Sequence, residues 1–449
     1  MKTLSEIKKI KDSIEKELLK RKGVTGVDIQ EKEVNGKKTG ELSIQIYVEK
    51  KKPVKSLKKS DLIPKTINGV KTDVKEEEFF AHYEKMSLAD FRAKVDATKY
   101  ATLQGGMSIG PCRAINNFIF VGTLGCIVTD NVSGQEMMLS NFHVMSVDNN
   151  WSPGDTLAQP ARNDGGTCAT DVVGTLQRSI LNADIDGAVA NISGRPYNCE
   201  VLDIGELNGT NVASNNMAVR KRGRTTELTY GTVTSTNLSV NIPYGQGVGN
   251  QVLTNQIRIE VDAAQNAQFG IGGDSGSVVV DENNNVIGLY FAGNNAGTVG
   301  VANPISDVLT QLDIDIYQCP KKIEIKETGK EFGKHEFKEG GKEFGKVEIK
   351  EFGKLEFKEG GKEFGKSEIK EFAKIEKLEK EKIEKPETKE FKEKDFEDPK
   401  HLVEGPGGLA PPRFPFNSNS YLESMRQHFI NQSQRPNLNK GALRNEKDC

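Results

Sequence analysis

The sequence predicts a mainly β protein, with a small α+β domain before a β-rich central block and a low-complexity tail after it. Three observations lead to this prediction. The 449 residues divide into blocks of different charge, the central block contains a single lysine, and its short β-rich runs alternate with turn residues. Many short strands at such spacing indicate a β-sandwich or a β-barrel.

Residues 1–75 are expected to form the small α+β domain. Apolar residues recur every three or four positions through residues 1–22, which predicts an amphipathic helix. Two strand-like runs flank the Asn-Gly pair at 35–36, and this pattern predicts a β-hairpin. Residues 54–64 are expected to form a short helix, and residues 66–76 a third strand.

A linker with one helical piece is expected over residues 76–104, and the β-rich block over residues 105–319. The β-rich runs of this block lie at 118–130, 137–144, 171–180, 186–192, 229–242, 255–261 and 276–293. Residues 1–100 carry 24 Lys and Arg against 17 Asp and Glu, whereas residues 101–319 carry 9 against 20. Because an acidic block repels phosphate, nucleic acid is not expected as a partner.

The end of the chain has a biased composition. Residues 320–400 form a Lys/Glu/Phe/Gly-rich repeat, in which the 20 residues 330–349 recur at 350–369 with two differences. Two copies are too few to stack into a solenoid core, and the balance of Lys and Glu favours a solvated chain. Residues 401–449 are expected to be a disordered C-terminal tail.

Cysteine usage and hydropathy bear on the compartment. The sequence shows neither a run of 18 apolar residues nor a secretory signal peptide. Its six cysteines form no C-x-x-C pair and are too sparse for a disulfide framework. We therefore expect reduced thiols and a cytoplasmic location, with non-classical export as the alternative. Neither metal-ligand spacing nor a phosphate loop is present, so no metal or other cofactor is expected.

The strongest chemical signal is Gly-Ile-Gly-Gly-Asp-Ser-Gly-Ser at residues 270–277, just before a β-rich run. A serine in a tight, glycine-flanked turn can expose its hydroxyl. The N–H groups of Gly273 and Ser275 can then converge on one point, as an oxyanion hole requires. Ser275 is the candidate nucleophile, although an ordinary glycine-rich β-turn would have the same sequence.

A serine nucleophile needs a base, and His143 is the one histidine of five that lies in the β-rich block. A lone histidine at a strand end can also be purely structural. The base in turn needs a carboxylate, and Asp184 and Asp186 are the candidates. An Asp that enters an apolar run should be buried and hydrogen-bonded, whereas either residue could instead lie in a surface turn.

Taken together, the order His143, Asp186, Ser275 and the surrounding motifs resemble the trypsin- and chymotrypsin-like serine peptidases. The matching motifs are Gly-Thr-Leu-Gly-Cys-Ile-Val before Leu-Ser-Asn-Phe-His-Val, Asp-Gly-Ala-Val-Ala, Gly-Gly-Asp-Ser-Gly-Ser and Val-Ile-Gly-Leu-Tyr-Phe-Ala-Gly. The resemblance covers about residues 105–315. Lys-Arg-Gly-Arg-Thr-Thr at 221–226 and the N-terminal domain are similar to a bacterial intracellular branch of the family.

The resemblance implies a double six-stranded β-barrel, with the active site in the cleft between the barrels. It implies that Ser275 attacks a carbonyl and that His143 takes and returns the proton. Asp186 would fix the tautomer of the histidine, and the N–H groups of Gly273 and Ser275 would bind the oxyanion. In this pattern Asp186 is favoured over Asp184, because a small residue, an alanine and an aliphatic residue follow it.

Three departures from the family pattern have consequences. Because no Ile-Val-Gly-Gly activation site precedes the histidine, the fold is expected to become active without a new N-terminus that pairs with Asp274. Val144 follows His143, so Cys126 lacks the partner that the family's disulfide needs. Phe269 stands where cleavage after Arg or Lys requires an acid.

Phe291, Ala292 and Gly293 are expected to line the substrate-binding site together with Phe269, which favours an apolar or small substrate residue. The leading hypothesis is a serine endopeptidase that hydrolyses peptide or protein substrates through an acyl-enzyme. The alternative is a catalytically weak or inactive peptidase-fold binding or scaffold protein, which acts through its repeat tail on an unknown partner.

Overall fold

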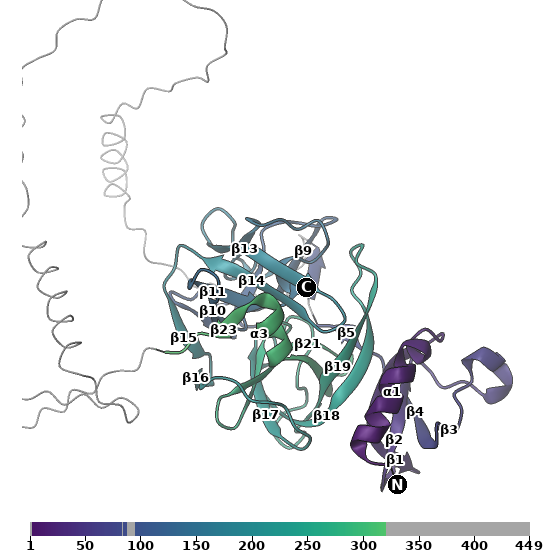
Figure 1. The fold of residues 1–449 in the computed structure, drawn as a ribbon. Helices are drawn as coiled ribbons and strands as arrows, with labels where there is room; N and C mark the ends of the chain where they lie inside the picture. The colour runs from purple at the N-terminus through teal and green to yellow at the C-terminus, as the bar shows by residue number, and fades with distance from the viewer. Residues whose placement is uncertain (1, 83, 88–94, 320–449) are drawn as a thin grey trace, which may run out of the picture. The chain divides into compact units, whose positions relative to one another are not determined.

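The computed structural model describes residues 2–82, 84–87 and 95–319. β-Strands dominate this part of the chain, which confirms the predicted mainly β fold class. The strands form sheets of 11, nine and three strands (Figure 1). The predicted repeat at 320–400 and the predicted disordered tail at 401–449 lie outside the described residues.

The N-terminal part places one helix on a short sheet. Helix α1 (Leu4–Leu19) starts at a capping box, and its apolar face packs on β1 (Val24–Val34) and β2 (Lys37–Val48). These two strands pair as the predicted hairpin, and β4 (Val70–Glu76) adds to β2 in parallel. Strand β3 (Thr66–Ile67) pairs with β4, so the predicted third strand is itself a small hairpin.

The short helix expected over residues 54–64 is absent from the structure. Two separate 3-10 turns, Val54–Ser56 and Lys59–Asp61, take its place. Neither turn contains a buried residue, so no packing stabilises a longer helix.

Strand β1 also pairs with β18 (Glu227–Pro243), so the N-terminal strands continue a sheet of the β-rich block. Buried polar side chains accompany this pairing. Lys11 Nζ donates to Ser239 Oγ at 2.9 Å, and that hydroxyl donates to Glu15 Oε2 at 2.6 Å. Each of these three buried polar side chains thus has a partner, which offsets the cost of taking it out of water.

The first half of the β-rich block belongs to the nine-stranded sheet. Its strands, in sheet order, are β23 (Ile314–Ile316), β10 (Cys126–Asp130), β11 (Glu136–Ser140), β14 (Asp186–Ile192), β13 (Val172–Leu181), β12 (Thr156–Ala158), β8 (Ser108–Pro111), β9 (Phe118–Thr123) and β6 (Glu84–Ser87). In this order β12 joins β13 to β8, and the short strands β23 and β6 lie at the two ends of the sheet.

The second half closes into a ring of six strands within the 11-stranded sheet. These strands are β17 (Ala218–Gly223), β20 (Val278–Asp281), β21 (Val286–Gly293), β22 (Val299–Pro304), β19 (Asn250–Val261) and β18. Neighbours in this order pair, and β17 also pairs with β18, which completes the barrel. A further sheet contains β7 (Leu103–Gly105), β15 (Tyr197–Val201) and β16 (Gly205–Glu206).

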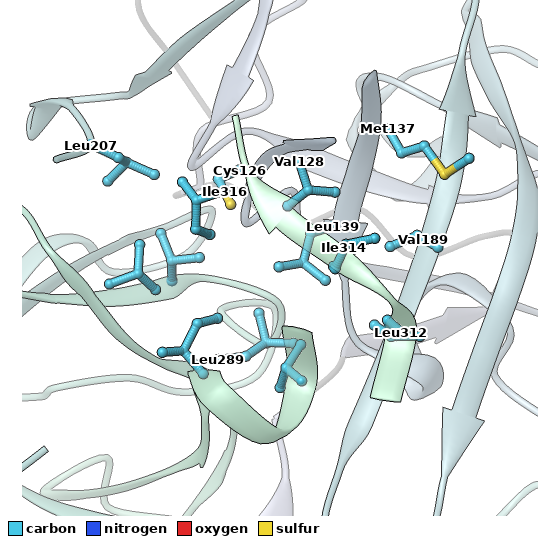
Figure 2. Close-up of a cluster of buried hydrophobic side chains, with 14 of the residues drawn as sticks. Cys126, Val128, Met137, Leu139, Val189, Leu207, Leu289, Leu312, Ile314 and Ile316 are labelled. Atoms are coloured by element: carbon cyan, nitrogen blue, oxygen red, sulfur yellow. The ribbon is translucent and has the colours of Figure 1, made fainter. Parts of the chain in front are cut away.

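The two halves share a buried apolar core that includes helix α3 (Ile305–Leu312). Figure 2 shows Val128 and Leu139 of the first half, Leu289 of the second, and Leu312 of α3 in one cluster. Strand β23 follows α3 directly and pairs with β10. The end of the described chain therefore returns to the first half and holds the halves together.

The segment 76–104, which the sequence assigned to a linker, contributes three strands. Besides β6 and β7 it contains β5 (Phe80–Ala81), which pairs with β21. Most of the expected helical piece, residues 88–94, lies outside the described residues.

The expectation of reduced thiols is wrong for four cysteines. Disulfides join Cys112 to Cys168 and Cys199 to Cys319, across sequence separations of 56 and 120 residues. Because such pairs meet only through the fold, their spacing carries no signal in the sequence. Cys126 is free and buried, which confirms the inference drawn from Val144. Disulfides persist in oxidising compartments, so the cytoplasmic expectation loses its thiol argument.

Candidate active site

The pairing of β11 with β14 brings His143 next to Asp186. His143 lies in the short helix α2 (Phe142–Met145) just after β11, and Asp186 is the first residue of β14. The imidazole Nδ1 bonds to Asp186 Oδ2, and the backbone N–H of His143 donates to Oδ1 at 3.2 Å. This pair of contacts fixes the ring orientation and directs Nε2 away from the carboxylate.

Three residues that the sequence analysis missed hold Asp186 in place. The hydroxyl of Tyr244 donates to Asp186 Oδ2 at 2.7 Å. Asn141 Nδ2 donates to the carbonyl of Asp186 at 2.6 Å, and the N–H of Asp186 donates to Asn303 Oδ1 at 3.1 Å. Asn141 stands in the Leu-Ser-Asn-Phe-His-Val motif and could have been found from the sequence. Tyr244, just after β18, and Asn303, in β22, are far from Asp186 in the sequence.

The other candidate carboxylate is elsewhere. Asp184 is exposed and accepts a hydrogen bond from Gln311 Nε2 at 3.2 Å. Asp186 is fully buried. The structure therefore places Asp186, and not Asp184, against His143.

Ser275 lies in the loop between β19 and β20, and it is fully buried. Its hydroxyl donates to the carbonyl of Phe291 at 2.9 Å. The backbone N–H groups of Gly273 and Ser275 both donate to the carbonyl oxygen of His82, at 2.7 and 3.4 Å. Two donors beside one serine hydroxyl thus converge on one carbonyl oxygen, which is the geometry of an oxyanion hole.

The backbone of Gly273 needs a glycine. Its φ is +96°, and a Cβ there would lie 2.3 Å from Thr225 Oγ1. That hydroxyl donates to the carbonyl of Gly272 at 2.8 Å, so it cannot move aside without loss of a bond. The positive φ and the close contact with Thr225 therefore both require a glycine in the turn that presents the N–H of Gly273.

Asp274 anchors the same loop from inside the fold. Its carboxylate accepts hydrogen bonds from the N–H groups of Thr225, Thr226 and Ile271, at 2.9, 3.0 and 2.9 Å. Lys221 Nζ lies 3.7 Å away, and both side chains are fully buried. The motif at 221–226 thus supplies three partners of Asp274, and Ile271 of its own loop supplies a fourth.

The backbone around Gly122, in β9, connects the histidine and serine loops. A Cβ at Gly122 would lie 2.4 Å from a methyl group of Val144, the residue after His143. It would also lie 2.8 Å from the carbonyl oxygen of Ser275, whose partner is the N–H of Thr123 at 2.8 Å. The loop of Ser275 and the helix of His143 therefore pack on the same point of β9.

Three of the four predicted substrate-binding residues, Phe291, Ala292 and Gly293, bind the backbone of residues 80–82 along β21. Ala292 and Gly293 pair with Ala81 and Phe80, and the carbonyl of Phe291 accepts the N–H of His82 at 3.0 Å. Phe269 is fully buried behind Tyr290, with ring centroids 5.8 Å apart. Tyr290, which the sequence analysis did not single out, contacts the His82 ring directly, since its hydroxyl lies 2.6 Å from Nδ1.

Burial controls the protonation of several groups here. It lowers the pKa of His82 to about 4, against a smaller opposite effect of Asp274. Burial also lowers the pKa of Lys221, although Asp274 partly compensates. The pKa of Tyr244 lies well above its usual value because of burial and the adjacent Asp186, so its hydroxyl stays protonated and donates.

Two other kinds of site, a metal site and a membrane-spanning helix, are absent from the described residues. Within the described residues, no group of three or more His, Cys, Asp or Glu side chains is placed to hold a metal ion. In the same part of the chain, every helix is too short or too polar to cross a membrane.

Neither a family model nor a curated protein matches the chain. Solved structures do match: a glutamic acid-specific serine protease (19% identity, TM-score 0.36) and protease A of Thermobifida fusca (18%, 0.36). A third is the chymotrypsin of Cellulomonas bogoriensis (20%, 0.34). They cover 48%, 49% and 48% of this chain and 100%, 100% and 99% of their own. Such low identities and TM-scores leave the site residues as the basis for assigning function.

Proposed function

We propose that this protein is a serine endopeptidase that acts through an acyl-enzyme at Ser275. The observation that carries the proposal is the convergence of the Gly273 and Ser275 N–H groups on one carbonyl oxygen, beside the serine hydroxyl. An ordinary glycine-rich turn has no reason to bind a carbonyl from a segment almost 200 residues away. Donors already aimed at a carbonyl stabilise the oxyanion that forms when it is attacked.

His143 acts as the general base and Asp186 as its positioning residue. Because Nδ1 faces the carboxylate, the proton of Ser275 is taken up at Nε2. The Ser275 hydroxyl, which donates to Phe291 in this structure, first rotates about its Cα–Cβ bond. The histidine then returns the proton to the leaving amine, and water hydrolyses the ester in a second cycle of the same groups.

A fluorophosphonate probe tests this assignment, because it reacts with an activated serine. The reaction is run in a His82→Gly background, in which the docked segment lacks the imidazole that bonds to Tyr290. The probe is expected to label this protein stoichiometrically, and Ser275→Ala to abolish labelling. Ser277→Ala is the matched control: it removes a buried hydroxyl two residues away, which bonds to the Asp274 carbonyl, and should retain the label. Full labelling of the Ser275→Ala protein would refute the nucleophile.

A further inference from the structure

A segment of the chain itself extends the edge of β21 beside Ser275. Phe80 and Ala81 pair antiparallel with Gly293 and Ala292, and the N–H of His82 donates to the Phe291 carbonyl at 3.0 Å. An extended peptide that adds to a sheet edge is a recurrent mode of peptide recognition. Residues 80–82 therefore bind as a peptide ligand would.

The residue after this strand, His82, presents its backbone carbonyl to the serine loop. The oxygen of His82 accepts from the N–H groups of Gly273 and Ser275, at 2.7 and 3.4 Å. In the proposed reaction these donors hold the oxygen of the carbonyl under attack. The carbonyl carbon of His82 thus occupies the place of the acyl carbon of a substrate.

The side chain of His82 fills a fitted site. It is buried, and its Nδ1 lies 2.6 Å from the Tyr290 hydroxyl. A Cβ at Gly293 would lie 2.6 Å from its Cε1, so a larger residue there would exclude the ring. The ring is thus recognised by hydrogen bonds to the Tyr290 hydroxyl and to the backbone of Asn294, and by the close approach of the Gly293 backbone.

The start of the strand is fastened to the fold as well. Glu77 accepts from Arg258 Nη2 at 3.1 Å and from Asn294 Nδ2 at 3.2 Å. The Phe79 ring is buried and packs edge-on against Tyr47, with centroids 5.3 Å apart. Contacts at both ends therefore keep residues 77–82 in register with β21.

We propose that residues 79–82 are a substrate of this same active site, and that the protein hydrolyses its own chain on the carboxyl side of His82. The inference rests on the proposed endopeptidase function and adds its specificity, a histidine as the residue that contributes the acyl group. The reaction is intramolecular, because the strand and the site belong to one chain.

The step balances with water as the one co-reactant. Ser275 Oγ bonds to the His82 carbonyl carbon and gives its proton to His143. The bond from that carbon to the next backbone nitrogen breaks, and His143 gives the proton to the new amino group. Water then cleaves the ester, which restores the serine and leaves a carboxylate at His82. The products are a fragment that ends at residue 82 and one that begins at residue 83.

The test follows the intact mass of freshly purified full-length protein at pH 7.5, at two concentrations that differ 100-fold. The expected result is conversion into the fragments 1–82 and 83–449, at one rate for both concentrations. Ser275→Ala should remain whole, and His82→Ala should slow the cleavage at least tenfold. Glu78→Ala, which changes an exposed residue of the same segment, should cleave like the wild type.

A second substrate separates failure of the inference from failure of the function. The peptide Phe-Phe-Ala-His-4-nitroanilide, which copies residues 79–82, is added to the His82→Gly protein. If Ser275 is needed for its hydrolysis but the wild-type chain stays whole, self-cleavage is refuted and the peptidase stands. If the His82→Gly protein neither hydrolyses the peptide nor reacts with a fluorophosphonate, the peptidase function fails. Cleavage after His82 in the Ser275→Ala chain would also refute the inference, because another protease would be responsible.

Discussion

At the scale of single residues, Asp186 and Asp184 offer a direct comparison two positions apart. Asp186 bonds to both His143 and Tyr244, whereas Asp184 faces solvent. Asp186→Asn should lower kcat about 10⁴-fold near neutral pH, the loss known for the same change in a Ser-His-Asp triad, because the wrong tautomer is held. Asp184→Asn should change kcat less than twofold. Steady-state assays that measure kcat for both variants test this prediction. A larger loss in Asp184→Asn than in Asp186→Asn would assign the positioning role to Asp184.

The protonation of His82 predicts a pH effect on docking of the strand 79–82. Its pKa is about 4 when docked, below the ordinary 6.5, so the undocked strand binds the proton more readily. Docking should therefore be strongest above pH 6.5 and weaken as pH falls from 6.5 towards 4, by up to about tenfold per unit. Hydrogen exchange of residues 79–82 in the uncut Ser275→Ala chain measures this.

The titratable groups that face the His82 ring are Asp274, His143 and Lys221, and the hydroxyl of Tyr290 bonds to it. His82→Phe is the control, since it keeps a ring but removes the titrating group. If its docking weakened equally on acidification, the proton would bind to one of the other groups and not to His82.

At the scale of elements, the loop 270–277 depends on the space around Gly273. Gly273→Ala should lower kcat about 10²–10³-fold, the range for loss of one oxyanion donor, because its Cβ would displace Thr225 or the turn itself. Gly154→Ala is a matched control: its φ is also +96°, but no atom lies within 4 Å of the added Cβ. It should cost about 1–2 kcal/mol of stability, the penalty for a non-glycine residue with a left-handed backbone. If Gly273→Ala were as active as Gly154→Ala, the contact at Gly273 would not be needed for catalysis.

Much of the site could be predicted from local sequence. Gly273 and Ser275 share one glycine-rich turn, and His143 follows a strand, so short motifs were enough to predict these residues. The contacts of Tyr244 and Asn303 with Asp186 could not be read in this way, because they join segments about 60 and 120 residues apart. The docking of residues 79–82 was missed for a similar reason. Its sequence, Phe-Phe-Ala-His, has no ligand signature of its own, and its docking becomes visible only in the folded structure, beside β21 and the loop 270–277.

At the scale of the whole molecule, the two disulfides predict a redox dependence. Both close long loops, and loss of a native disulfide typically costs about 2–5 kcal/mol. Reduction should therefore lower the melting temperature. Non-reducing peptide mapping should show Cys112 linked to Cys168 and Cys199 linked to Cys319. Cys126 should resist alkylation in the native protein, because burial raises its pKa to about 12. Equal melting temperatures with and without reductant would contradict this.

That the tail is dispensable for activity and stability is a prediction from the sequence alone. Residues 322–449 have little apolar content to pack, and ordering them would cost about 1–2 kcal/mol per residue. A chain that stops after Pro320 should therefore keep its kcat/KM and its melting temperature. A tenfold loss of activity, or a clear drop in melting temperature, would show that the tail is part of the folded enzyme.

The central claim is that Ser275 and His143 act as one catalytic unit. Its most direct test is the kcat/KM for a nitrophenyl ester in the His82→Gly background, with Ser275→Ala, His143→Ala and the double variant. Groups that act as a unit give losses that are far from additive. The double variant should therefore lose no more than Ser275→Ala alone, on the order of 10⁶-fold. If the two single losses multiplied in the double variant, or if Ser275→Ala retained the parent rate, the two residues would not form one unit.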